Sequence, residues 1–237
     1  MDERVQRITH DNSLELNFSF NMEIESAYVI TLRGHETSER LAKRCVESAQ
    51  THDMPAKLWP AYDGTSGSIK TPPELQSQNF MRWFKVLDPH LSTTEVACAL
   101  SHISLWAHCV DLDRPIIIFE HDAVVVAPFK VHPLFSCITY LGSYEQAKQQ
   151  WAVVPTPPHG SHGANYHFIC RAHAYAIDPS VAKNMLAHVL RQGICESLDL
   201  MLRADLFPVL QVGLIAYDEP EGTTIVNRKR DPYGNSR

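Results

Sequence analysis

The most informative segment of this sequence reads Pro115-Ile116-Ile117-Ile118-Phe119-Glu120-His121-Asp122. The proline stops any helix before it, and the four apolar residues that follow predict a strand that is buried on both faces. Such a strand is typical of the centre of a mainly parallel sheet. In open sheets of this kind, ligands bind beyond the carboxyl ends of the strands. Glu120 and Asp122 therefore occupy the position at which a binding site is expected.

The segments before this strand alternate between strand and helix patterns. Residues 27–32 are an apolar, β-branched run that ends at a glycine turn, and they predict a buried first strand. Apolar residues at helical spacing predict a helix from about Ser38. A second strand is expected at residues 57–59, before a turn at Asp63-Gly64.

A long helix is expected to precede the central strand. Residues 92–95 read Ser-Thr-Thr-Glu, the pattern of a capping box, and an apolar stripe follows as far as Val110. Residues 64–91 form a long excursion, a kind of segment that in enzymes often serves as a lid or a binding loop. After the central strand, the pattern predicts strands at residues 151–154, 172–177 and 209–212, and helices at residues 179–190 and 197–204.

Alternating strands and helices indicate a three-layer α/β fold with a mainly parallel central sheet. A barrel of eight strand–helix units would be crowded in 237 residues. Residues 1–23 are polar and weakly patterned, so we expect an N-terminal extension followed by one domain at residues 24–237. The net charge of −6 argues against nucleic acid as a partner, because phosphate binding needs a surplus of Lys and Arg.

The cysteines and the apolar segments predict a cytoplasmic location. The six cysteines contain no Cys-x-x-Cys pair, and several lie in apolar segments, as buried thiols in a reducing compartment do. No secretory signal is apparent at the N-terminus. The best apolar stretch ends at Glu120 and is far too short for a transmembrane helix.

Glu120 and Asp122 have two interpretations on spacing alone. Two carboxylates one residue apart after a buried strand can bind a divalent metal ion that also contacts a diphosphate. Alternatively, Glu120 ends the strand in solvent and Asp122 belongs to a turn. The spacing does not decide between them.

A set of short motifs, in order, resembles glycosyltransferase family 25, which contains lipooligosaccharide and collagen galactosyltransferases. The resemblance extends from about Val29 to Val226. The motifs are Val29-Ile30-Thr31-Leu32-Arg33, Arg40, Ala61-Tyr62-Asp63-Gly64, Glu95-Val96-Ala97-Cys98-Ala99-Leu100-Ser101-His102 with Trp106, Ile117-Ile118-Phe119-Glu120-His121-Asp122, Tyr140-Leu141-Gly142, His173-Ala174-Tyr175-Ala176-Ile177, Leu198-Asp199 and Thr223-Thr224-Ile225.

The resemblance implies a GT-A-type fold, with three α/β/α layers, and an inverting transfer of a hexose from a UDP-sugar. Galactose is the sugar expected from the family. The acceptor would be a saccharide, a lipid-linked saccharide or a hydroxylated protein. The implied cofactor is a divalent metal ion, Mn²⁺ or alternatively Mg²⁺.

The resemblance also assigns residues to the site by position. The acidic triplet would supply metal ligands, and the segment at residues 217–224 would complete the site with Asp218 or Glu219. The expected metal ligands are Glu120, Asp122 and Asp218, and the expected donor-binding residues are Arg33, Asp63, Gly64, Ser101, His102 and Glu120.

This sequence departs from the family pattern in two places. His121 stands where the family usually has an acidic residue, and Ala97 or Thr94 stands where it has a glycine. Imidazole favours softer metal ions than carboxylate does, so His121 either changes the metal preference or points into the core.

An inverting transfer needs a base that deprotonates the attacking hydroxyl group. Asp199, at the start of a short predicted helix, is our candidate. The alternative is that Asp199 only interacts with the helix dipole, which favours acidic residues in the first turn.

Other signals carry less weight. His159, His162 and His167 match no standard zinc spacing, and their loop could instead cover the acceptor. His102 and His108 are, from the sequence alone, expected to be hydrogen-bonded helix residues. The basic cluster at residues 228–230 is a solvated tail that permits at most transient contact with an anionic membrane.

Two rival functions remain. A sugar nucleotidyltransferase usually has a glycine-rich phosphate loop after its first strand, whereas here only Gly34 follows. A catalytically silent family member that binds a sugar nucleotide is the other rival, and His121 is the residue that favours it.

Overall fold

A seven-stranded sheet forms the centre of the protein. The computed structural model describes residues 21–24, 26–78, 80–133, 136–142, 154–155 and 172–219. In spatial order the strands are β3 (Ala56–Pro60), β2 (Ser26–Thr31), β4 (Ile116–Glu120), β9 (Ala174–Ile177), β7 (Ile138–Tyr140), β10 (Val209–Gln211) and β8 (Val154–Pro155). β9 and β8 run opposite to the other strands of this sheet. The α/β class with a mostly parallel sheet is therefore confirmed, but the antiparallel strand beside β4 was not predicted.

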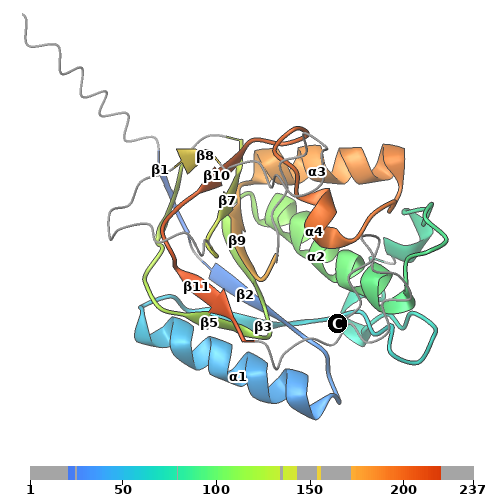
Figure 1. Cartoon of the computed structure of the whole chain (residues 1–237), viewed down its shortest axis with the longest axis horizontal. Helices are drawn as coiled ribbons and strands as arrows, with labels where there is room; N and C mark the ends of the chain where they lie inside the picture. Colours follow the sequence, from blue (N-terminus) through green and yellow to red (C-terminus); the bar gives the residue numbers. More distant parts are fainter. Residues whose placement is uncertain are drawn as a thin grey trace, which may run out of the picture.

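Helices cover both faces of the sheet (Figure 1). α1 (Glu36–Thr51) packs on one face, and α2 (Thr93–Leu112) with α3 (Pro179–Gln192) packs on the other. Alternate residues of β2 point to opposite faces, so Ala27 and Val29 join the core beneath α1 while Tyr28 and Ile30 join the core beneath α2. One core on each face of the sheet gives the three layers that were expected, helix, sheet and helix.

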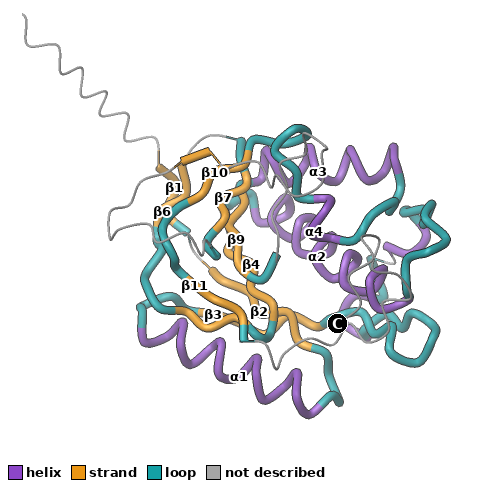
Figure 2. Tube along the Cα trace, in the orientation of Figure 1, coloured by secondary structure: helices purple, strands orange, loops and turns teal. Residues whose placement is uncertain are grey.

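Short elements complete the described part of the chain (Figure 2). They are β1 (Asn21–Glu23), β5 (Ala123–Val125), β6 (Val131–Pro133), β11 (Ala216–Asp218), the 3₁₀ helices η1 (Pro73–Leu75) and η2 (Phe80–Arg82), and the single-turn helix α4 (Leu198–Met201). β1 pairs with β6, so the last three residues of the expected extension at 1–23 are paired. β5 pairs with β11 and sets Asp218 opposite Ala123, one residue after Asp122.

The capping box at the start of α2 is confirmed. The Oγ atom of Ser92 accepts a hydrogen bond from the backbone N–H of Glu95, and the Glu95 carboxylate accepts one from the backbone N–H of Ser92. α2 ends at Leu112, shortly before Pro115, and Asp113 adopts a left-handed conformation there. These local signals fix where α2 begins and ends, and therefore which of its residues lie beside the end of β4.

Three other expectations have different outcomes. The strand expected at 151–154 overlaps the described strand β8 only at Val154, and the helix expected at 197–204 forms only at Leu198–Met201. The excursion at 64–91 contains η1 and η2. Across the described ranges, no helix combines the length and the apolar character that crossing a bilayer requires.

Candidate functional site

An open cleft lies where the carboxyl ends of β2, β3 and β4 meet one side of α2. Its empty space is about 660 Å³, part of which is open to solvent. Parallel strands bring their carboxyl ends to the same edge of the sheet, which explains why distant segments meet here. The lining includes Ile30, Tyr62, Gly64, Cys98, His102 and the acidic triplet at residues 120–122.

Glu120 and Asp122 both line this cleft. The Glu120 side chain is 29% exposed, and Asp122 is 9% exposed. The backbone carbonyl of Asp122 accepts a hydrogen bond from the Glu219 N–H at 3.1 Å. Its carboxylate atom Oδ1 is buried, and among the described residues it has no hydrogen-bond partner. Glu120 is thus partly buried at the end of β4 and not in bulk solvent, whereas Asp122 does lie in a turn, as the alternative interpretation expected.

The two carboxyl groups hold protons more tightly than usual. Burial, and next the charge of Asp199, raise the pKa of Glu120 from 4.5 to about 7. Burial, and next the charge of Glu120, raise the pKa of Asp122 from 3.8 to about 7. A cation between them would stabilise the charged forms, because it offsets both the desolvation and the mutual repulsion.

Asp218 adds a third carboxyl group next to this pair. Its place is set by the β5–β11 pairing, and its charge raises the pKa of both Glu120 and Asp122. The Asp218 Oδ1 atom is 4.0 Å from Nδ1 of buried His173. Glu219, the alternative to Asp218, instead forms an ion pair with Arg44 at 3.7 Å. The proposed carboxylates are hard oxygen donors, which suit Mn²⁺ or Mg²⁺.

Only some of the residues assigned to the donor lie in the cleft. Gly64, Ser101, His102 and Glu120 line it, whereas Arg33 and Asp63 do not. Arg33 is mostly exposed and pairs with Glu74. The Asp63 carboxylate accepts hydrogen bonds from the Oγ1 and N–H groups of Thr65, which lower its pKa.

Ser101 connects the helix to the neighbouring loop. Its Oγ atom accepts a hydrogen bond from the Tyr62 N–H at 2.9 Å and donates one to the Ala97 carbonyl at 2.7 Å. The Ser101 hydroxyl group is therefore engaged within the fold, where it holds the backbone of Tyr62 against α2.

His102 is buried but directed at the cleft. Burial lowers its pKa to about 3, so the ring is neutral at physiological pH. Its Nδ1 atom is 2.8 Å from the Tyr175 hydroxyl, which also accepts a hydrogen bond from the Trp106 indole N–H. His108, further along α2, is hydrogen-bonded to Tyr28. Both histidines are therefore hydrogen-bonded helix residues, as predicted.

Cys98 also lines the cleft, although no role in the site was predicted for it. It lies one turn before His102 on α2, and its thiol donates a hydrogen bond to Glu120 over 3.9 Å. Burial, and next the charge of Glu120, hold the pKa of this thiol well above its usual value. Cys98 and His102 are four residues apart in a predicted helix, and this spacing alone indicates that their side chains lie on the same face.

Asp199 lies near the same carboxylates although it comes from a distant segment. The charge of this half-buried residue raises the pKa of Glu120 and acts on Cys98 and His102. The Asp199 Oδ1 atom accepts a hydrogen bond from the Ala172 N–H at 3.0 Å, which ties α4 to the segment before β9. Asp199 therefore contacts the backbone and also acts electrostatically on the cleft.

His121, which stands between Glu120 and Asp122 in the sequence, also lines the cleft. Its positive charge, when present, lowers the pKa of both Glu120 and Asp122. It therefore points toward the site rather than into the core. The histidine-rich loop at 159–167 and the basic cluster at 228–230 lie outside the described residues.

We expect Gly64→Ala to lower the free energy of unfolding by about 2–3 kcal/mol. A Cβ atom at this position would lie 2.2 Å from the Thr93 carbonyl oxygen, so the start of α2 would have to shift. Gly67→Ala is the control, because Gly67 has open space around it and only a positive φ of 80°. That change should lower the free energy by about 1 kcal/mol. Urea unfolding of both variants is the measurement, and equal losses would contradict the close contact.

Comparison with known proteins agrees with the resemblance in the sequence. Residues 25–138 match the sequence model of a family described as Glycosyltransferase family 25 (LPS biosynthesis protein). The matched region is just under half of the chain and contains the acidic triplet and all of α1 and α2. No curated protein matches this sequence.

Proposed function

We propose that this chain, whose residues 25–138 match the model of glycosyltransferase family 25, transfers a hexose from a UDP-sugar to a saccharide acceptor with inversion at the sugar carbon. Family membership supports a glycosyltransferase. The observation that carries the proposal is the acidic pair Glu120 and Asp122 in an open cleft at the carboxyl ends of the strands. We further propose that residues 24–237 form one catalytic domain of the GT-A type, and that the sugar is galactose.

The proposed donor site uses the cleft from β2 to β4. The apolar and aromatic side chains of Ile30 and Tyr62 would contact the nucleoside, and Gly64 would lie beside it in the cleft lining. The diphosphate would lie near the carboxyl groups. An acidic wall repels a diphosphate, so a counter-charge is needed at this point.

Glu120, Asp122 and Asp218 would hold Mn²⁺, or alternatively Mg²⁺. The residues fit such an ion because the buried Oδ1 atom of Asp122 has no hydrogen-bond partner in the described part of the chain. In addition, the charges of Glu120 and Asp218 raise the pKa of Asp122, and the charge of Asp218 raises the pKa of Glu120. When bound, the cation would neutralise the diphosphate of the donor and of the leaving UDP.

Asp199 would act as the base. Its carboxylate takes the proton of the acceptor hydroxyl, the hydroxyl oxygen bonds to the anomeric carbon of the sugar, and the bond from that carbon to the UDP oxygen breaks. Support for this role comes from the hydrogen bond of the Ala172 N–H, which positions the Asp199 carboxylate, and from the charge of Asp199, which acts on Glu120 in the cleft.

The proposed acceptor is a saccharide or a lipid-linked saccharide, in keeping with the family description, with a hydroxylated protein as the alternative. The proposed location is the cytoplasm. A silent sugar-nucleotide-binding protein is the second candidate, because His121 occupies the middle of the acidic triplet. Release of UDP from a UDP-hexose, which only an active enzyme produces, separates the two.

We expect UDP to bind the full chain in the presence of Mn²⁺ and to bind at least about tenfold more weakly without it, since the cation offsets repulsion between the diphosphate and the carboxylates. Isothermal titration of UDP under the two conditions measures this difference. Uridine, which lacks the diphosphate, is the control and should show no Mn²⁺ dependence. Absence of UDP binding under both conditions would contradict the donor assignment.

A further inference from the structure

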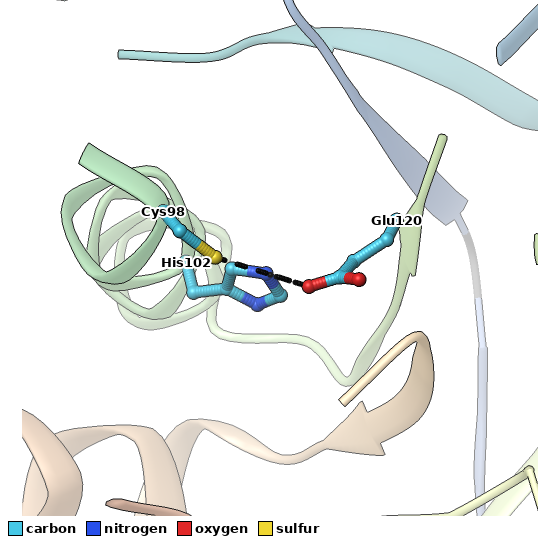
Figure 3. A group of neighbouring side chains, drawn as sticks. All are labelled: Cys98, His102 and Glu120. Atoms are coloured by element: carbon cyan, nitrogen blue, oxygen red, sulfur yellow. Dashed lines mark hydrogen bonds and ion pairs between the residues drawn. The ribbon is translucent and has the colours of Figure 1, made fainter. Parts of the chain in front are cut away.

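Cys98, His102 and Glu120 bring three different metal-binding atoms to one wall of the cleft (Figure 3). Cys98 and His102 are one turn apart on the same face of α2, and Glu120 reaches toward them from the end of β4. The Glu120 Oε1 atom is 3.4 Å from His102 Nε2 and 3.9 Å from Cys98 Sγ. All three ligand atoms lie within 4.8 Å of one another.

These separations are close to those of a tetrahedral zinc site. With zinc–ligand distances of about 2.0 Å to nitrogen and oxygen and about 2.3 Å to sulfur, tetrahedral angles place N and O about 3.3 Å apart, and S and O about 3.5 Å apart. The observed distances of 3.4 Å and 3.9 Å need only small side-chain adjustments to match.

The His102 ring is already oriented for this role. It stacks on Tyr175, with ring centroids 5.7 Å apart and planes 12° apart, and its Nδ1 atom is hydrogen-bonded to the Tyr175 hydroxyl. The residue is 1% exposed. Its Nε2 atom faces Glu120 without hydrogen-bond geometry, so among the described residues it has no hydrogen-bond partner. Metal-binding histidines are commonly held through the other ring nitrogen in this way.

We propose that Cys98, His102 and Glu120 bind Zn²⁺, with the fourth position of the tetrahedron open to the cleft. Thiolate and imidazole favour Zn²⁺ over Mn²⁺ and Mg²⁺, so this set differs in preference from the carboxylates Glu120, Asp122 and Asp218. The two sets share Glu120, whose carboxylate would bridge the two ions when both are bound. Binding releases the thiol proton of Cys98 to solvent, because the thiolate is the ligand. A water molecule or another exogenous ligand completes the coordination, since all three residues line the open cleft.

A second cluster in the described ranges lacks these properties. His132, Cys137 and Asp178 also lie close together, but all three are buried. The ring nitrogens of His132 are hydrogen-bonded to the Pro133 carbonyl and to Thr139. The Asp178 carboxylate accepts hydrogen bonds from backbone N–H groups, including that of Cys137. These ligand atoms are used by the fold, so this cluster is structural.

The test is metal binding by the full chain in the absence of any nucleotide. We expect Co²⁺, as a spectroscopic probe, to give a thiolate-to-cobalt charge-transfer band and the intense visible bands of four-coordinate cobalt, and Zn²⁺ to abolish both. Cys98→Ser should remove the charge-transfer band and weaken Zn²⁺ binding at least about 100-fold. Glu120→Gln should weaken it as well. Cys195→Ser, which changes an exposed cysteine outside the cluster, should bind as the unchanged chain does.

Two results would overturn the proposal. One is the absence of a thiolate-to-cobalt band at saturating Co²⁺, even if histidines elsewhere bind the metal. The other is an unchanged band in Cys98→Ser, with circular dichroism showing that the variant is folded. Because neither measurement involves UDP, a failed zinc site leaves the donor proposal standing, and a failed UDP titration leaves the zinc site standing.

Discussion

Asp122→Asn is expected to lower hexose transfer by about 10²- to 10³-fold while leaving the fold intact. The proposal makes Asp122 a ligand of the cation that neutralises the leaving diphosphate, and an amide is a weaker ligand than a carboxylate. The substitution keeps the shape of the side chain. The backbone carbonyl of Asp122, which accepts hydrogen bonds from Glu219 and Arg44, is unaffected. UDP release measured across a range of Mn²⁺ concentrations should show both a lower turnover and a weaker response to the metal.

The same variant has an expected effect on stability that depends on pH. Without a cation, burial and the charge of Glu120 raise the pKa of Asp122 from 3.8 to about 7. Between about pH 4 and pH 7 the folded chain therefore holds more protons than the unfolded chain, so the free energy of unfolding falls as the pH rises. Above this range the buried charge is fully present and destabilises the fold. Asp122→Asn removes it and should raise the metal-free stability by about 1–2 kcal/mol at pH 8, with no gain at pH 4.

Two measurements separate a metal ligand from a structural residue. Asp111→Asn makes the same chemical change at an exposed position near the end of α2, and should leave both turnover and stability unchanged. Full turnover in Asp122→Asn would remove the metal role. A loss of stability at pH 8 would show instead that the carboxylate makes a favourable contact in the fold.

Local signals predicted the scaffold of the site well. The capping box located the start of α2, and the apolar run before Glu120 predicted a strand buried on both faces, as β4 is. Both signals lie within a few residues of the feature they predict. The position of the acidic pair at the end of β4 follows directly from them, because strand ends in such sheets open onto the binding edge.

Features that depend on distant pairing could not be predicted in the same way. β9 runs antiparallel beside β4, and the β5–β11 pairing brings Asp218 next to Asp122. Nothing in the local pattern specifies either pairing, and only the family resemblance pointed to Asp218. Arg33 and Asp63 stand in a family motif, but their side chains interact with Glu74 and Thr65 and do not line the cleft. Their assignment to the donor stays a prediction.

Asp199→Asn is expected to lower turnover by about 10²- to 10³-fold with little change in the KM for the donor. The carboxylate would lose its ability to take the proton of the acceptor hydroxyl. The fold should remain, because the amide oxygen of asparagine can still accept the hydrogen bond from the Ala172 N–H. Steady-state kinetics with varied donor and varied acceptor measures both parameters.

The pair of variants Asp199→Asn and Asp199→Ala distinguishes a base from a residue that only anchors α4. Alanine removes the hydrogen bond from the Ala172 N–H as well as the charge. It should therefore lower the free energy of unfolding by about 1 kcal/mol, in addition to lowering the turnover. If Asp199 only anchors the helix, asparagine should keep full turnover, because it preserves that hydrogen bond, and alanine alone should be impaired. Equal loss of turnover in both variants, with lower stability only in alanine, excludes a role as anchor alone, since both variants lack the charged carboxylate and only alanine lacks the hydrogen bond.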